Sequence, residues 1–179
     1  AAEPAGAVHH DAHFTGIHAL DRAMLAHVPD GFGCIVRTAY IAEVPHRRVA
    51  AVPHTGLWLD VGDARAYLEA NLAVLDGSVA PPIDPWERAA GGLQGGSARP
   101  GSGHLEGPVW IGAGARVAGS VARSVIGAGA TVPRGARLRD CVVWDDVQVP
   151  PGDWHRQVFA GSHRVDADAA RQTKPTDTP

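Results

Sequence analysis

The sequence is poor in the residues and runs that mark several classes of protein. It has only two cysteines, Cys34 and Cys141, which lie far apart and each in an apolar context. Their spacing forms no metal knuckle, so both are predicted to be reduced core residues of a cytoplasmic protein. There is no basic run and no long apolar span, and the formal net charge is only -3. These absences argue against a nucleic-acid partner and against a membrane partner.

The start of the chain lacks an initiator Met and a signal peptide. It opens on the loose run AAEPAGAVHHDA, which indicates a processed start or a piece of a longer protein. His9, His10 and His13 form an HHxxH pattern, but no helix surrounds it and no acidic or sulfur ligand lies nearby. Loop histidines are therefore favoured over a zinc site.

A mixed α/β pattern is present before residue 80. His13–Leu20 reads as a strand, and Asp21 is placed to cap a short helix through Ala26. Cys34–Val44 carries apolar residues at helical spacing. The runs RVAAV and GLWLDV, at 48–52 and 56–61, suggest a hairpin. So few strands and helices cannot cover both faces of a sheet, so sheet partners are expected outside this chain.

The stretch from Thr55 to Leu75 contains one residue without a structural explanation. Its first part resembles the end of a buried strand, and Asp63 is placed to cap the helix that follows. The helix has one apolar face, formed by Tyr67, Leu68, Leu72 and Leu75. Asp60 lies inside the apolar strand and is not needed as a cap. It could cap a backbone turn, pair with an arginine such as Arg65 or Arg37, or bind a cation.

Residues after 80 change in character twice. Residues 81–107 are rich in Gly, Pro, Ser and Ala and predict a linker, in which Trp86 is a packing anchor. Six-residue units then follow, each led by an aliphatic residue and each usually carrying a small residue four positions later. The leading residues are Ile111, Val117, Ile126, Val132 and Leu138. Three such units make one turn of a triangular coil, and about two turns fit before Pro150.

These segments, taken in order, resemble the C-terminal part of sugar-1-phosphate nucleotidyltransferases. The elements that carry the resemblance are FTGIHAL, then WLDVGDARAYLEANLAVL, then a Pro/Gly linker, then the hexads of the IGAGA type. The similarity is greatest to the mannose-1-phosphate guanylyltransferase-like branch. It implies the C-terminal part of a Rossmann-like catalytic domain over 1–80, a linker over 81–107, a short left-handed parallel β-helix over 108–165 and a disordered tail over 166–179.

The resemblance also implies chemistry for two residues. Family members join a nucleoside triphosphate to a sugar 1-phosphate and release pyrophosphate, with Mg²⁺ held by two carboxylates. Asp60 matches one of these carboxylates. Gly16 matches the glycine whose bare backbone lies close to the sugar, although a glycine at a strand bulge is an equal interpretation. His18 stands where relatives carry an aromatic residue in the sugar pocket, and a structural histidine is favoured there.

The sequence departs from the family in ways that leave alternatives open. It lacks the glycine-rich loop that grips the triphosphate, the first metal carboxylate and the Glu-Lys-Pro element. We therefore expect no catalytic residue in this chain and no activity from it alone. One alternative is a hexapeptide-repeat acyltransferase, although His104 and His155 are expected to flank the coil. The other is a non-catalytic module that forms homo-oligomers through the coil.

Overall fold

The computed structural model describes residues 13–31, 33–80, 87–89, 92–94 and 101–169. The chain divides into two compact units, at Ala1–Trp58 and Leu59–Pro179. The first unit contains short helical segments, and the second contains a longer helix and nearly all of the strands. The two units therefore differ in class, but their boundary lies before helix α2 (Ala64–Leu75) and not near residue 80, where the composition changes.

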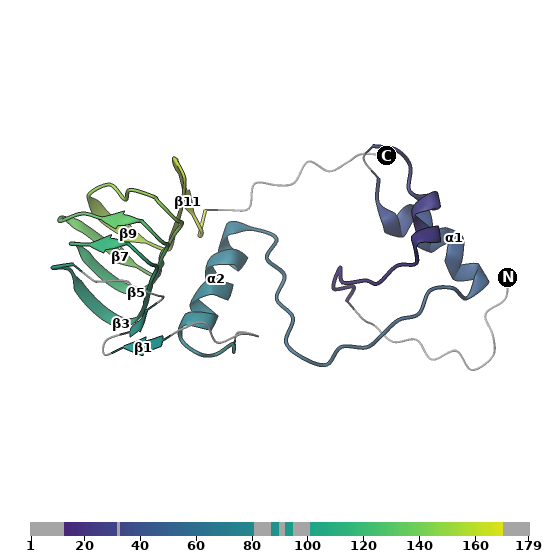
Figure 1. Ribbon diagram of the computed structural model, residues 1–179, viewed down its shortest axis with the longest axis horizontal. Coiled ribbons are helices and arrows are strands. Elements are labelled where there is room, and N and C mark those ends of the chain that lie inside the picture. Colours follow the sequence, from purple (N-terminus) through teal and green to yellow (C-terminus); the bar gives the residue numbers. More distant parts are fainter. Residues whose placement is uncertain (1–12, 32, 81–86, 90–91, 95–100, 170–179) are drawn as a thin grey trace. The chain divides into compact units, whose positions relative to one another are not determined.

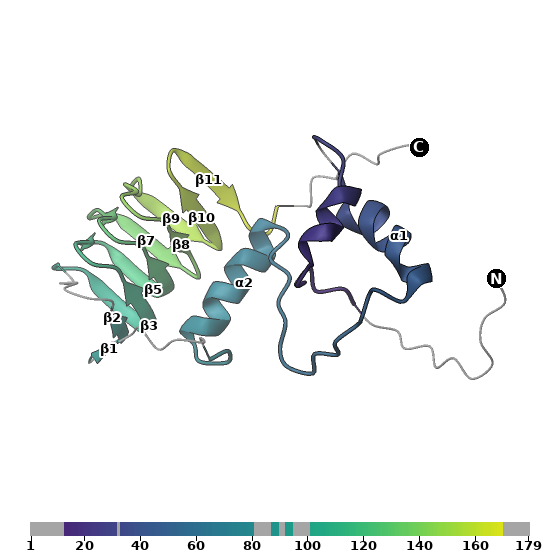
Figure 2. The ribbon, with the colours of Figure 1, turned by 45° about the vertical axis from the view of Figure 1, so that its right-hand side comes forward.

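A parallel β-solenoid of about four turns occupies residues 104–159 of the second unit (Figure 1). Its strands are β3 (His104–Ile111), β4 (Arg116–Val117), β5 (Ser120–Ile126), β6 (Thr131–Val132), β7 (Ala136–Arg139), β8 (Val142–Val143), β9 (Gly152–His155) and β10 (Gln157–Ala160). Figure 2 shows successive turns of the coil stacked one upon another. The predicted hexad coil is confirmed as a parallel β-solenoid, but it is about twice as long as the two turns expected.

The strand register defines walls along the coil. On the first wall, β3, β5, β7 and β9 pair in parallel, so that Ser120 lies beside Arg137. On the second wall, β3, β5, β8 and β10 pair in parallel. The third wall holds β4 and β6. On the second wall Ile111 pairs with Ile126 and Ile126 with Val143, which are spacings of 15 and 17 residues. The turns are therefore shorter than three full hexads.

The second wall ends in reversed strands at both ends. At one end β2 (Gly92–Gln94) pairs in parallel with β3, and β1 (Glu87–Ala89) pairs antiparallel with β2. At the other end β11 (His163–Asp166) pairs antiparallel with β10. Figure 2 shows β11 folded back beside β10. The Arg164 guanidinium also lies 4.5 Å from the ring centre of Trp154, a cation–π contact at this end.

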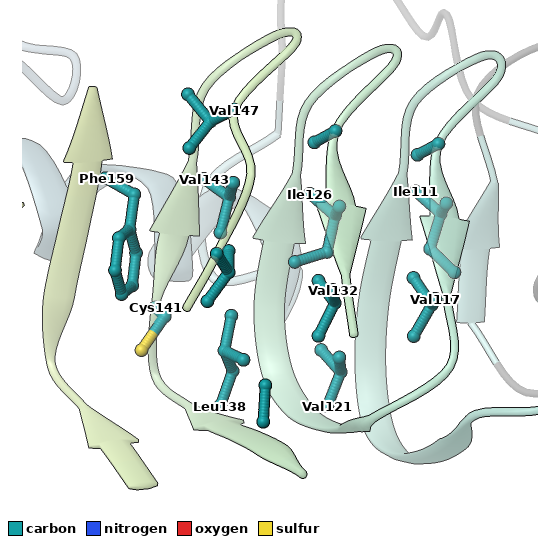
Figure 3. Packing of buried hydrophobic residues seen from close by; sticks show 14 of the residues in the cluster. Ile111, Val117, Val121, Ile126, Val132, Leu138, Cys141, Val143, Val147 and Phe159 are labelled. Atoms are coloured by element: carbon teal, nitrogen blue, oxygen red, sulfur yellow. The ribbon is translucent and has the colours of Figure 1, made fainter. Parts of the chain in front are cut away.

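The leading residues of the hexads form the core of the solenoid (Figure 3). All five are at most 2% exposed: Ile111, Val117, Ile126, Val132 and Leu138. Four of the small residues that follow them lie in the same core: Ala115, Val121, Ala130 and Ala136. The fifth, Val142, faces the other way and belongs to a second apolar cluster. The buried column that the hexads predict is thus confirmed.

One corner of the coil repeats with a left-handed backbone. Gly107, Arg123, Asp140 and Arg156 have φ values of 69°, 41°, 53° and 52°. Arg123 belongs to the three residues that interrupt the hexad count, so this interruption is a regular corner of the coil. Non-glycine residues adopt this backbone region at a cost, so contacts made by their side chains must stabilise them.

Helix α2 (Ala64–Leu75) covers part of the second wall, as Figure 1 shows. Asp63 caps it as predicted, because the Asp63 side chain accepts a hydrogen bond from the Ala66 backbone N–H at 2.8 Å. The predicted apolar face is confirmed too. Leu68, Leu72 and Leu75 are buried in a cluster with the outward residues Val142 and Val158 of the solenoid, and with Tyr67, Trp110, Val125 and Ala167.

The first unit has the predicted helices but not the predicted strands. Asp21 caps η1 (Arg22–His27) through a bond from the Ala23 N–H, and η2 (Val36–Tyr40), α1 (Ile41–Glu43) and η3 (Val44–His46) follow one another directly. The strand expected at His13–Leu20 and the hairpin expected at 48–61 are wrong, because both segments are irregular. The described residues of 13–80 contain no strand, so the Rossmann-like sheet is absent from them.

Three further expectations are corrected. Strand β3 begins at His104, so the solenoid starts inside the segment assigned to the linker. Ala167 is buried against helix α2, so the start of the segment assigned to a disordered tail is packed. Cys34 is exposed, whereas Cys141 is buried as predicted, and both are free thiols. Trp86, His9 and His10 lie outside the described residues.

Candidate functional site

Asp60 lies in an exposed, irregular segment that leads into helix α2. The apolar run around Asp60 predicts a buried strand, in which a carboxylate would need a cation to offset its desolvation. This prediction is wrong, because the Asp60 side chain is exposed to water. The alternative of a pair with Arg65 is wrong, because Arg65 pairs with Glu69 at 2.9 Å instead. A metal role for Asp60 now rests on the family resemblance alone.

The described residues do not form a magnesium site by themselves. They contain no group of three or more His, Cys, Asp and Glu side chains that could hold a metal ion. Mg²⁺ is commonly bound by one or two carboxylates together with substrate phosphates and water. Asp60 could therefore supply one ligand, and the remaining ligands would come from a substrate phosphate, from water or from another segment.

Gly16 lies at an exposed bend among aromatic residues. Its φ of 78° lies in the region that favours glycine, and a Cβ added there would meet no atom within 4 Å. The His18 ring lies 6.0 Å from both the Phe14 ring and the Tyr40 ring. The bulge interpretation of Gly16 is wrong because no strand forms around it. The role of Gly16 beside a sugar stays a prediction.

Glu43 is a buried carboxylate that the sequence analysis missed. It is only 6% exposed, and its Oε1 lies 2.8 Å from His27 Nε2. Its Oε2 lies 2.5 Å from Arg48 Nε, an ion pair without the alignment of a hydrogen bond. The signal that could have revealed it is an acidic residue inside the apolar spacing of 34–44. Glu43 links η1 to the helical segment that contains α1.

Two arginines from the repeated corner hold helix α2 and the end of the coil. Arg156 Nε donates to both carboxylate oxygens of Asp168 at 2.8 Å, and its Nη2 donates to Glu69 Oε1 at 3.2 Å. Arg123 Nη2 reaches Asp76 Oδ2 at 3.5 Å. Glu69 lies on α2 and Asp76 is its C-cap, so the contacts reach the helix at two points. These side-chain contacts also offset the cost of the left-handed backbone at Arg123 and Arg156.

The contacts of Arg156 with Glu69 and of Arg123 with Asp76 form what we call the clamp on helix α2. Both of its carboxylates have lowered pKa values. Hydrogen bonds from Ser78 and then the contact with Arg123 lower the pKa of Asp76. A hydrogen bond from Arg65, assisted by Arg156, lowers the pKa of Glu69. Both shifts mean that the charged carboxylates are stabilised in the folded protein, because donors and cations favour the ionised form.

Two adjoining hollows lie where helix α2 meets the second wall. Their volumes are about 370 and 610 Å³, and both are lined by Asn71, Trp110 and Val125. The larger one is also lined by Tyr67, Trp144 and Asp145. We call the pair the α2 groove. Volumes of this size are typical of small-molecule sites, and the sequence analysis gave no sign of it.

The two histidines that bear on the acyltransferase alternative lie within the coil, and the expectation that they flank it is wrong. His104 begins β3 and His155 ends β9. His155 Nε2 lies 3.3 Å from Asp140 Oδ2, while Asp140 Oδ1 accepts from Arg123 at 2.7 Å. Asp140 thus pairs with both His155 and Arg123. This arrangement is typical of a network of ion pairs and not of a carboxylate that only orients a catalytic base.

The two thiols have opposite environments. Burial raises the pKa of Cys141 to about 11, which keeps it protonated and unreactive. Backbone N–H groups of Arg37 and Val36 lower the pKa of the exposed Cys34. Among the described residues, no helix is both long and apolar enough to span a bilayer.

Comparison with known proteins adds no assignment to this geometry. No family model matches the chain, and no protein with curated annotation matches it. The resemblance described in the sequence therefore remains a hypothesis, supported by the elements that carry it.

Proposed function

We propose that this chain is the C-terminal portion of a sugar-1-phosphate nucleotidyltransferase. The complete enzyme would form a nucleoside-diphosphate sugar, of the GDP-mannose kind, and pyrophosphate. One observation carries the proposal: the W-L-D-V-G element leads into the capped helix α2, and this helix packs on a hexad solenoid of the same unit. This combination and order of elements is the feature that resembles the family.

The reaction needs charge neutralisation more than covalent help. An oxygen of the sugar phosphate attacks the α-phosphorus, the bond to the bridging oxygen breaks, and pyrophosphate leaves with the electron pair. Mg²⁺, when bound, would neutralise charge on the phosphates. In this proposal Asp60 supplies one ligand to that ion, and its exposure leaves the carboxylate accessible to a cation. Gly16 would allow the sugar to approach the backbone.

The exposed apolar residues of 13–61 support the catalytic-domain part of the proposal. They include Phe14, Ile17 and Leu57 of the first unit and Leu59 and Val61 at the start of the second, all in segments without secondary structure. Such segments are suited to pair with strands of a Rossmann-like sheet in the complete enzyme. A left-handed coil, self-association through the coil and a cytoplasmic location also belong to this proposal. The exposed thiol of Cys34 suits a reducing compartment.

The proposal is tested by comparing two proteins: this chain alone, and this chain joined to the segment that its gene encodes upstream. Pyrophosphate release from GTP and mannose 1-phosphate is measured with and without Mg²⁺. We expect Mg²⁺-dependent turnover from the longer protein and none from the 179-residue chain. We expect Asp60→Ala to lower kcat by at least about 100-fold, because a metal ligand is lost. Asp30→Ala, in an exposed turn of the first unit, is the matched control and should leave kcat unchanged.

Each result has a defined consequence. Turnover by the isolated chain contradicts its assignment as a portion of the enzyme. Unchanged turnover in Asp60→Ala removes the metal role of that residue. Absence of turnover by the longer protein with every tested pair of nucleoside triphosphate and sugar 1-phosphate ends the proposal.

A further inference from the structure

The α2 groove has the composition of a ligand site and lies within the second unit. Trp144 is 49% exposed, although it is one of the largest apolar side chains of the chain. The Tyr67 ring meets it at 6.3 Å between centres and at 66° between planes. Because the two rings contact each other edge to face, they form no slot between two parallel rings, and the exposed half of Trp144 is the aromatic surface that remains open.

Polar groups of the groove have spare hydrogen-bonding capacity. The indole Nε1 of Trp110 is buried and has no partner among the described residues. Buried N–H groups are nearly always paired, so an orphan donor in the lining of a hollow calls for an acceptor. Asn71 uses its Nδ2 to donate to the Tyr67 carbonyl at 2.9 Å, which fixes the amide and leaves its Oδ1 as an acceptor.

Asp145 sets the charge of the groove. Its Oδ1 accepts from the Ala128 backbone N–H at 2.7 Å, so the carboxylate is held in place by the solenoid backbone. It is the only charged residue among those that line the two hollows in the described part of the chain. A carboxylate with no lysine or arginine beside it disfavours a phosphate or another anion.

We propose that the α2 groove binds a neutral carbohydrate ring. One face of a pyranose is rich in C–H groups and can stack on the exposed face of Trp144. Its hydroxyl groups can donate to Asn71 Oδ1 and Asp145, and a hydroxyl or ring oxygen that displaces the side chains covering Trp110 Nε1 can accept from it. A quaternary ammonium suits the groove less well, because it brings no acceptor for Trp110 and because Tyr67 and Trp144 already contact each other.

This site is distinct from the proposed catalytic chemistry. Neither Gly16 nor Asp60 lines the groove, and binding can be measured without turnover. Failure of the nucleotidyltransferase proposal would therefore leave this inference untouched, and the reverse also holds.

The test is a binding measurement on the whole chain. Methyl α-mannoside, methyl α-glucoside, adenosine, tetramethylammonium and inorganic phosphate are titrated while tryptophan fluorescence and saturation-transfer NMR are recorded. We expect a glycoside to bind in the millimolar range, with transfer strongest to the protons of its apolar face. Trp144→Ala should weaken binding by about tenfold, because the stacking face is lost.

Two further variants locate the site. Trp110→Phe keeps an aromatic ring, although a smaller one, but removes the N–H donor, and it should also weaken glycoside binding. Trp58→Ala, in the first unit, is the matched control and should leave binding unchanged. Circular dichroism of each variant verifies its fold, and Asn71→Ala replaces any tryptophan variant that fails to fold.

The inference is overturned by any of three results. No glycoside saturates the protein at tens of millimolar; adenosine, tetramethylammonium or phosphate binds while the glycosides do not; or glycoside binding survives unchanged in both groove variants.

Discussion

The two units of this chain bury their apolar residues to very different extents. In the solenoid unit, one core runs through all turns and a second cluster joins helix α2 to the wall. In the first unit, the described residues that are buried are Ala39 and Glu43 alone. The exposed side chains there include Phe14, Ile17 and Leu57. The first unit thus has helices of its own without a core of its own.

The difference shows what makes a segment self-sufficient. A solenoid turn pairs with the turn that precedes it, so its partners lie only 15 to 17 residues away on the second wall. Such near-neighbour pairing needs no distant segment. The irregular segments of the first unit have strand-forming composition, but composition does not supply a strand to pair with. Their apolar residues therefore remain at the surface.

The largest expected effect comes from truncating the same residue type in each unit. Ile126 is fully buried in the core, and Ile17 is 78% exposed. Ile126→Ala should lower the free energy of unfolding of the solenoid by about 2–5 kcal/mol, because it leaves a cavity. Ile17→Ala should change it by less than about 0.5 kcal/mol. Urea denaturation followed by circular dichroism measures both, and equal losses would erase the contrast between the units.

The reactivity of the two thiols tests the difference in burial between the two units, because Cys34 is exposed and Cys141 is buried. Cys34 should react with a disulfide reagent in the folded protein at least about 100-fold faster than Cys141, because Cys141 is shielded until the solenoid opens. The single variants Cys34→Ala and Cys141→Ala assign the two rates by absorbance. Rapid labelling of Cys141 in the folded state would show that the solenoid core opens as readily as the first unit.

Close packing at the corners predicts the next effect. A Cβ added at Gly119 would collide with the carbonyl oxygens of Ala136 and Pro133, whereas one added at Gly62 would make ordinary contacts with Asp60. Gly119→Ala should therefore destabilise the solenoid by about 1–3 kcal/mol, and Gly62→Ala should be nearly neutral. Thermal unfolding compares them. A neutral Gly119→Ala would mean that the corners are loosely packed.

The smallest expected effect concerns the clamp on helix α2. The pKa values of Asp76 and Glu69 are lowered from ordinary values of 3.8 and 4.5, so their stabilisation is present at neutral pH. It is lost as the pH falls below those values and the carboxylates are protonated. These groups are partly exposed, so the loss is less than about 1 kcal/mol.

Thermal unfolding at neutral and acidic pH measures this loss. The double variant Asp76→Asn, Glu69→Gln should lose less stability on acidification than the original protein. An identical pH dependence in the two proteins would show that these ion pairs do not stabilise the packing of helix α2.

The sequence predicted best where the partners are local. The column from Ile111 to Leu138 and the cap Asp63 could be read directly, because hexads and helix caps depend on neighbours in sequence. The sequence predicted too short a coil. Its first and last turns contain large residues, Leu105, Trp154 and Phe159, and do not repeat the hexads of aliphatic and small residues.

Tertiary contacts that join distant residues escaped the sequence analysis. The burial predicted for Asp60 depended on a strand that does not form. The ion pairs of Glu43 and the groove beside Trp110 join residues from separate elements, and no spacing in the sequence reports them. The same holds for Arg123, whose contact with Asp76 spans 47 positions of the chain.

The antiparallel strands β1 and β11 have a consequence for how copies of the protein meet. A uniform parallel coil presents at each end an edge that a neighbouring coil could extend in the same direction, and this is a route to filaments. Here each end of the second wall turns back on itself, so an incoming coil meets a strand of opposite polarity. Extension of that wall by parallel stacking of coils is therefore disfavoured at the described strands, which directs any self-association to other faces of the coil.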